Sequence, residues 1–238
     1  MRSERLTALS GYIRQQRYCR MGDLAEHFHI SLATIHRDVQ ELVVMGHVHK
    51  VHGGVVSLLA ASVELRQDGG HFLQRMELQR EAKAKVAAAA EREIVNGDVI
   101  FLDSSTTCMF LARRLQESRL AELSILTNSV LVAQEFHRFP PCFVMVCVGG
   151  CFNVQLNSFL GRMALDNLRQ LRISKAFISC AGYAGGRITT YLEEHATFLR
   201  GVLDAAQRSY LLVDRSKATR TGLYSICELS RVDKVISS

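Results

Sequence analysis

Four polar side chains that could contact DNA stand close together near the N-terminus. They are Thr34, His36, Arg37 and Gln40. Hydroxyl, imidazole, guanidinium and amide groups form the hydrogen bonds by which proteins contact base edges and phosphates. All four lie off the apolar stripe that Ile35, Val39 and Leu42 form at helical spacing. An ordinary amphipathic surface helix has the same pattern, so this stretch alone leaves both interpretations open.

A second group of polar residues follows apolar runs later in the chain, and each run predicts a buried strand. The group consists of Asp103, Ser104, Ser105, Thr106, Thr107, Asn128, Ser129, Gly149, Gly150 and Lys217. Hydroxyls and free backbone N–H groups at a helix start suit a phosphate, and the lysine would add a positive charge. Each cluster by itself could also be a simple capping turn. Because the carboxyl ends of parallel strands line one crevice, their recurrence favours a shared binding site.

The first group requires a helix to present it, and the surrounding sequence predicts one over residues 31–42. Ser31 is a suitable N-cap because its hydroxyl can accept a free backbone N–H of the first turn. A first helix is expected over residues 3–17 and a short second helix around 22–28. Residues 29–31 then form the turn into the third helix. Two helices joined by so short a turn are typical of a helix-turn-helix DNA-binding motif.

A β-hairpin is predicted directly after these helices. Residues 47–52 alternate polar and apolar side chains, Gly53-Gly54 can form a tight turn, and residues 55–58 can return as a second strand. Three helices and this wing make a compact DNA-binding module over residues 1–57. The side chains expected to contact DNA are those of Ser31, Thr34, His36, Arg37, Gln40, Lys50 and His52.

The charge of this module is modest. The whole chain has a formal net charge of +6, but residues 1–57 contain seven lysines and arginines against five aspartates and glutamates. A basic balance permits an anionic partner without requiring one. DNA binding would therefore depend on where the charges are placed rather than on their number.

The second part of the chain follows a loosely patterned stretch, residues 58–74, which we expect to be a linker. Residues 75–94 are rich in Ala, Glu, Lys and Arg and predict one long helix. We expect it to cover the sheet of the second domain, and a dimer helix is the alternative. From Asp98 onward, strand-like runs alternate with helical segments. This alternation predicts an α/β domain with a mostly parallel sheet over residues 75–238.

Length and composition limit the class of protein. With 238 residues, 48% of them hydrophobic and 22% charged, the chain has the balance of a two-domain globular protein. No apolar run reaches the ~18 residues of a membrane span, and no signal-peptide segment follows the N-terminus, so a cytoplasmic protein is expected. The seven cysteines form no C-x-x-C pair, which disfavours disulfides and zinc, including a site at Cys147 and Cys151. We expect no cofactor.

The N-terminal module resembles the DNA-binding domain of the DeoR family of bacterial transcriptional regulators. The resemblance rests on residues 34–38, on Leu42 and Gly46, and on the Val-His-Gly-Gly segment at residues 51–54. The family usually has two arginines before the aspartate, and His36 stands in place of the first. Histidine is shorter than arginine and only partly charged at neutral pH. The departure could therefore alter which base or phosphate is contacted.

The second domain resembles the effector domain of the same family, which is similar in fold to ribose-5-phosphate isomerase. The matching segments are residues 103–107, 127–129, 149–150, 161, 193–194 and 214–217. The resemblance implies that the polar strand ends bind a phosphorylated sugar. Ser105 departs from a common glycine and Cys108 from a common threonine. Relatives usually continue with a further strand beyond residues 235–236, so the sheet edge is expected to lack a strand or to receive it from a partner chain.

These features favour a sequence-specific transcriptional regulator of carbohydrate metabolism, most often a repressor in this family. Its expected partners are double-stranded operator DNA, a phosphorylated sugar and further copies of the chain in a dimer or tetramer. A sugar-phosphate isomerase is one alternative, but residues 179–182, Ser-Cys-Ala-Gly, lack the carboxylate base of related isomerases. The other alternative is a winged-helix metal or redox sensor, suggested by the cysteines and the N-terminal histidines. His47, His49 and His52 lack the spacing of a helical ligand pair.

Overall fold

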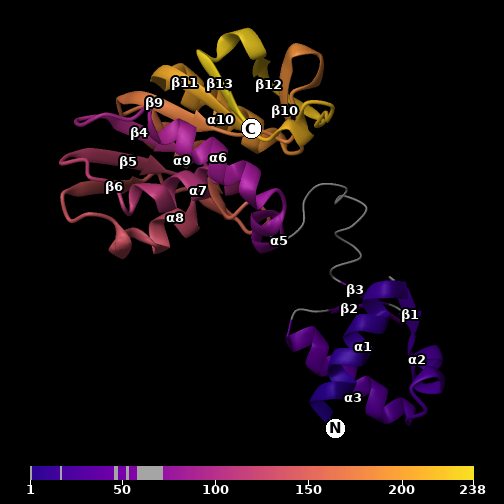
Figure 1. The fold of residues 1–238 in the computed structure, drawn as a ribbon. Coiled ribbons are helices and arrows are strands. Elements are labelled where there is room, and N and C mark those ends of the chain that lie inside the picture. Colours follow the sequence, from indigo (N-terminus) through magenta and orange to yellow (C-terminus); the bar gives the residue numbers. More distant parts are fainter. Residues whose placement is uncertain (1, 17, 46–47, 52–53, 58–71) are drawn as a thin grey trace. The chain divides into compact units, whose positions relative to one another are not determined.

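The computed structural model describes residues 2–16, 18–45, 48–51, 54–57 and 72–238 (Figure 1). The chain divides into two compact units, residues 1–69 and residues 70–238. His47, His52, Gly53 and most of the expected linker lie outside the described residues.

Within its described residues the first unit contains three helices and a three-stranded antiparallel sheet. The helices are α1 (Arg2–Gln16), α2 (Met21–His27) and α3 (Leu32–Val44), and the strands are β1 (Tyr18–Arg20), β2 (Val48–Val51) and β3 (Gly54–Ser57). The predicted helix-turn-helix and wing are confirmed. The main difference in bounds is that α1 begins one residue earlier than expected and α3 ends two residues later.

Strand β1 is an addition to the predicted hairpin. It pairs antiparallel with β3, so that Tyr18 lies opposite Val56 and Arg20 opposite Gly54. A Cβ at Gly54 would come within 2.5 Å of the Cys19 carbonyl oxygen, so this pairing requires glycine. Three residues are too few to show the alternation that marks a strand in a sequence. The strand fixes the wing to the segment between α1 and α2.

The second unit is built on a six-stranded parallel sheet with the order β13-β11-β9-β4-β5-β6 (Figure 1). Its strands are β4 (Val99–Leu102), β5 (Leu123–Thr127), β6 (Phe143–Cys147), β9 (Ile173–Ile178), β11 (Ala206–Val213) and β13 (Lys234–Ser237). Outside this sheet, β7 (Cys151–Asn153) pairs antiparallel with β8 (Ser158–Leu160), and β10 (Arg187–Thr190) with β12 (Tyr224–Glu228). The predicted α/β class is confirmed.

Helices cover both faces of the sheet. On one face lie α5 (Phe72–Glu77), α6 (Arg80–Glu91), α7 (Thr106–Leu115) and α8 (Val130–Gln134), and on the other α9 (Gly161–Leu168) and α10 (Glu193–Ala205). In β4, Ile100 and Leu102 contribute to the first core layer and Phe101 to the second. Burial on both sides explains the continuous apolar run that marks this strand in the sequence. None of the described helices is long and apolar enough to span a membrane.

The single helix predicted over residues 75–94 is wrong, because the structure has two helices, α5 and α6, separated at Gln79. Gln79 has a φ of 52°, in the left-handed region that no helix of L-residues continues through. Glutamine is a good helix former, so the sequence gives no sign of the break. Packing favours it, since Phe72 of α5 and Val86 of α6 are both buried in the core. The expectation that this segment covers the sheet is confirmed for α6.

The strand order places a topological switch point between β4 and β9. From β4 the chain moves outward to β5 and β6, and it returns to β9 on the other side of β4. The segments that leave β4 and β9 therefore diverge at the carboxyl edge of the sheet. Open α/β sheets bind their ligands at such points. The polar segment 103–107 leaves β4 here.

Candidate functional site

Helix α3 begins with the cap predicted for it. Ser31 has an extended backbone conformation, and its Oγ accepts a hydrogen bond from the Thr34 backbone N–H at 3.2 Å. The two hydroxyl oxygens, Ser31 Oγ and Thr34 Oγ1, lie 2.8 Å apart. Two of the predicted DNA contacts are therefore fixed in position by the start of the helix itself.

The other polar residues of α3 form one exposed face. The residues of the apolar stripe, Ile35, Val39 and Leu42, are at most 1% exposed. The predicted DNA contacts that lie exposed are Ser31, His36, Arg37 and Gln40 at α3 and Lys50 on β2, and Thr34 is half-buried. The structure thus leaves these side chains accessible, and their contact with DNA stays a prediction.

Asp38 links α3 to α1 through an ion pair. Its side chain is 1% exposed and is bound by Arg5 of α1, whose Nε donates to Oδ2 at 2.7 Å and whose Nη2 donates to Oδ1 at 3.2 Å. The hydrogen bond to Asp38 raises the pKa of the Arg5 guanidinium. A buried carboxylate needs such a partner. Sequence reasoning missed the pair because its members are 33 positions apart.

Asp103 joins the two sides of the switch point. It is 1% exposed, and its Oδ1 accepts a hydrogen bond from the Ser105 backbone N–H at 2.8 Å. Its Oδ2 accepts one from the Ser179 backbone N–H at 2.6 Å. Because Ser105 follows β4 and Ser179 follows β9, this carboxylate holds the ends of both strands together. Asp103 shapes the site, and its contact with an effector stays a prediction.

The hydroxyl-rich segment after β4 starts helix α7. Ser105 is the N-cap, and its Oγ accepts a hydrogen bond from the Cys108 backbone N–H at 3.1 Å. The φ of Ser105 is −75°, an ordinary value, so this position does not require the glycine of the family pattern. Thr107 Oγ1 is buried without a hydrogen-bond partner among the described residues. Such an atom indicates a place that a ligand or a water completes.

The ends of β5 and β6 carry the other predicted contacts. Asn128 Nδ2 donates to Ser158 Oγ at 2.6 Å, while its Oδ1 is buried without a partner in the described structure. Ser129 is the N-cap of α8. A Cβ at Gly150, whose φ is 117°, would lie 2.5 Å from the Leu160 carbonyl oxygen. Gly150 therefore permits close packing, and a ligand contact at Gly149 and Gly150 stays a prediction.

Three cations from separate elements approach this edge of the sheet. Lys217, the predicted one, donates from Nζ to Ser179 Oγ at 3.0 Å. Lys83 of α6 is 4% exposed and donates to the backbone carbonyls of Arg75 and Leu78. Arg75 of α5 has its Nε buried without a partner among the described residues. Sequence reasoning missed Arg75 and Lys83 because both belong to the segment expected only to cover the sheet.

Among the described residues, carboxylates lie near these cations without pairing with them, since the charge of Asp103 acts on Arg75 and that of Asp214 on Lys83. Burial lowers the pKa of Arg75, and burial, followed by repulsion from Lys217, lowers the pKa of Lys83 to about 8. The oxygens of Asp103 are taken by backbone N–H groups, and Asp214 Oδ1 accepts a hydrogen bond from the Ser216 backbone N–H at 3.1 Å. In the described part of the chain none of the three cations forms an ion pair. A bound anion would supply the direct ion pair that these cations lack.

His195, near the start of α10, is a further residue that sequence reasoning missed. Its Nδ1 lies 3.0 Å from Thr190 Oγ1, and its Nε2 is buried without a partner among the described residues. Burial lowers its pKa to about 4, so the ring is neutral at pH 7. The charges of Asp103 and Arg75 both act on it. A neutral imidazole can donate or accept one more hydrogen bond through the free nitrogen.

We refer to these residues as the switch-point cluster, which consists of Arg75, Lys83, Asp103, Thr107, His195 and Lys217. Helices from both faces of the sheet contribute to it, α5 to α7 from one face and α10 from the other. Its polar atoms suit an anionic, hydrogen-bonding ligand. In the described part of the chain, no group of three or more His, Cys, Asp or Glu side chains is placed to hold a metal ion.

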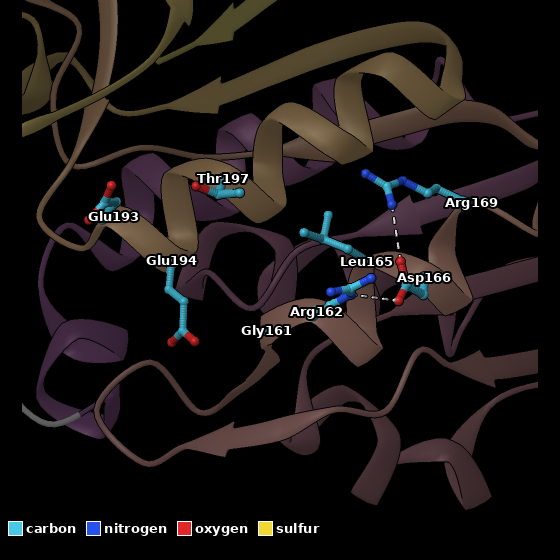
Figure 2. A pocket seen from close by; sticks show the side chains of 8 residues that line it. All are labelled: Gly161, Arg162, Leu165, Asp166, Arg169, Glu193, Glu194 and Thr197. Atoms are coloured by element: carbon cyan, nitrogen blue, oxygen red, sulfur yellow. Dashed lines mark hydrogen bonds and ion pairs between the residues drawn. The ribbon is translucent and has the colours of Figure 1, made fainter.

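A groove of about 540 Å³ lies between α9 and the first turns of α10 (Figure 2). Its two arginines share one carboxylate, since Asp166 pairs with Arg162 at 3.6 Å and with Arg169 at 3.0 Å. Glu193 and Glu194 line its other side. Two carboxylates at the edge disfavour a phosphate. The switch-point cluster is the better candidate for an anion.

In comparisons with known proteins, the two units of the chain match different family models. A family model described as the DeoR C terminal sensor domain matches residues 78–238, and one described as the DeoR-like helix-turn-helix domain matches residues 5–60. The chain is 29% identical over 228 residues to the L-fucose operon activator of Haemophilus influenzae, covering 95% of this chain and 88% of the relative. It is 26% identical over 234 residues to the glycerol-3-phosphate regulon repressor of Escherichia coli, covering 98% and 89%.

Among solved structures, ribose 5-phosphate isomerase A from Methanocaldococcus jannaschii aligns with a TM-score of 0.42 and 19% sequence identity. The alignment covers 59% of this chain and 55% of that chain.

Proposed function

Because the chain belongs to the DeoR family of transcriptional regulators, we propose that it binds operator DNA through α3 and the wing, and that a phosphorylated sugar at the switch-point cluster controls this binding. Its relatives are named regulators, and the chain is likewise a regulator rather than an enzyme. One observation supports the effector: cations without ion-pair partners meet buried polar atoms without hydrogen-bond partners within the described residues. A phosphate would form ion pairs with the cations, and sugar hydroxyls would form hydrogen bonds with the unpaired atoms.

The regulated genes are proposed to serve carbohydrate metabolism. The two relatives are named for L-fucose and for glycerol-3-phosphate, one as an activator and one as a repressor. We propose a repressor, the more common action in this family. A homo-oligomer would pair the DNA-binding modules, as repeated half-sites require.

Control by the effector requires a difference in affinity. A sugar phosphate changes operator binding only if it binds the DNA-competent and DNA-incompetent states of the protein unequally. By the same linkage, operator DNA must change the affinity for the sugar phosphate.

The DNA-binding half of the proposal is tested by selecting binding sites from a random DNA library and by gel shift at two salt concentrations. We expect one sequence to bind tighter than unrelated DNA by at least about 10³-fold at moderate salt. Equal affinity for all sequences would overturn this half.

The effector half is tested by thermal shift with ribose 5-phosphate, glucose 6-phosphate, fructose 6-phosphate, fructose 1-phosphate and glycerol 3-phosphate. Each phosphate is compared with its unphosphorylated counterpart, since a ligand raises stability by mass action. We expect at least one phosphate, and none of the counterparts, to raise the melting temperature. Failure of every phosphate would overturn this half.

A further inference from the structure

Helix α5 brings Arg75 to the switch-point cluster. The helix has six residues, Phe72–Glu77, and is the first described element after residues 58–71. A helix this short is not stable by itself in water. Phe72 and Met76, 8% and 7% exposed, anchor α5 in the core, where the helix contacts α7. Arg75 is left between these anchors, where the charge of Asp103 acts on it.

The guanidinium of Arg75 has few partners. Its Nη2 donates to the Gln155 carbonyl at a long 3.4 Å, and its central carbon lies 5.7 Å from the centre of the Phe72 ring. Its Nε is buried without a partner among the described residues. A guanidinium carries five N–H donors in a planar fork and binds phosphate oxygens in pairs. The donors of Arg75 therefore match a phosphate better than they match their present surroundings.

Lys83 fastens α5 to α6. Its ammonium group donates to the carbonyls of Arg75 and Leu78, which lie in the last turn of α5 and just beyond it. A cation at this end satisfies carbonyls that have no partner within the helix and interacts favourably with the helix dipole. The left-handed Gln79 separates the two helices. The position of α5 thus depends on a few contacts that lie beside the cluster.

We propose that Arg75 binds the anionic group of the effector, so that effector binding orders α5, the helix through which the chain enters the sensor unit. The proposal rests on the proposed function and adds a residue and a consequence to it. The phosphate binds the guanidinium of Arg75 within the cluster. Helix α5 becomes more ordered as a result, because Lys83, Phe72 and Met76 hold the same short helix. Helix α5 is the first described element of the second unit, so this change occurs where the described sensor unit begins.

The test compares wild type with Arg75→Gln in the full-length chain. The probes are inorganic phosphate and the sugar phosphate that gives the largest thermal shift in the panel above. Removing a charged hydrogen bond is expected to weaken binding of the sugar phosphate by roughly 10- to 100-fold. Hydrogen exchange should show that the sugar phosphate slows exchange at residues 72–77 in wild type. In the variant at saturation, slowing should persist at residues 103–107 and be lost at residues 72–77.

Arg80→Gln is the matched control. Arg80 begins α6, is 68% exposed and pairs with Glu77 at 3.4 Å, so its loss removes the same charge outside the cluster. Both probes should bind this control as they bind wild type. Arg75→Lys keeps the charge without the fork and guards against a failure of Arg75→Gln to fold. We expect it to lose affinity by a few-fold, because an ammonium group is a point charge.

The outcomes separate this inference from the proposed function. If the sugar phosphate binds wild type and both Arg75 variants equally, the role of Arg75 is overturned and the effector site survives. The inference is likewise overturned, and the effector site survives, if the sugar phosphate binds wild type but leaves hydrogen exchange at residues 72–77 unchanged. If no sugar phosphate binds wild type, the effector half of the proposed function is overturned and this inference with it.

Discussion

In the DNA-binding unit, the polar side chains that face a partner are exposed, and the buried carboxylate of Asp38 has both oxygens bound by Arg5. At the switch-point cluster the polar side chains are buried or half-buried, and several of their atoms lack partners among the described residues. In its described residues the first surface has its buried carboxylate paired, so it needs no ligand to complete this contact. In its described residues the second lacks direct ion pairs and several hydrogen bonds, so a bound ligand would stabilise it more. This difference suits a regulator, in which the effector site must respond.

The largest effect is expected from Arg37→Ala, which removes a cation from the exposed face of α3. Operator affinity should fall by about 1–3 kcal/mol if Arg37 makes a bidentate base contact or a charged phosphate contact. Fluorescence anisotropy with labelled operator DNA measures this. Arg162→Ala removes an exposed charge from the sensor unit and should leave the affinity unchanged. A loss confined to the effector response would show that the contacts of α3 are wrongly assigned.

The next effect is expected from Lys217→Gln, which removes a cation from the cluster. Affinity for the sugar phosphate should fall by roughly tenfold, whereas operator affinity without effector should stay within about twofold. Isothermal titration calorimetry and anisotropy measure the two. Lys85→Gln, at an exposed position of α6, is the control. If Lys217→Gln loses operator affinity more than affinity for the sugar phosphate, the cluster is structural and not regulatory, and the contrast between the two regions is wrong.

A smaller effect concerns His195 and pH. Its folded-state pKa of about 4 lies below the ordinary value of 6.5. Between these two pH values His195 is therefore protonated in the unfolded chain and neutral in the folded chain. The free energy of unfolding should fall as pH drops from 6.5 to 4, with no further loss from this group below 4. Relative to His195→Gln, wild type should lose about 1 kcal/mol between pH 7 and pH 5, allowing for partial solvent screening. Urea unfolding at both pH values measures it, and parallel curves would exclude a buried neutral imidazole.

The smallest effect is expected from His36→Arg, which restores the residue common in the family. Arginine is charged at every physiological pH, so operator affinity should rise about two- to threefold at pH 7.5. If the new charge contacts a phosphate, the slope of log affinity against log salt concentration should become more negative by up to about one unit. Anisotropy at a series of salt concentrations measures both. A weakened complex would mean that the imidazole of His36 makes a contact that arginine cannot replace.

Sequence alone predicts the first region better than the second for a physical reason. Exposure on α3 follows from the 3.6-residue period, so the stripe of Ile35, Val39 and Leu42 already identifies the outward residues. The segment at Asp103 is also visible, because a polar run directly follows a buried strand.

The cluster as a whole could not be read from the sequence. Arg75 and His195 lie 120 positions apart and meet only because the strand order brings α5 and α10 to the same edge of the sheet. The break at Gln79 depends on tertiary packing and has no local signal. Asp38 was visible as a residue of the family pattern, but its partner Arg5 was not, because nothing local connects α1 to α3.

The account depends most on the claim that the cluster and the DNA-binding unit are coupled. The direct measurement is operator affinity by anisotropy, with and without a saturating sugar phosphate from the panel, in wild type. We predict at least about a fivefold change in affinity, the lower end of ordinary allosteric coupling. A sugar phosphate that binds and stabilises the protein yet leaves operator affinity unchanged would contradict the account.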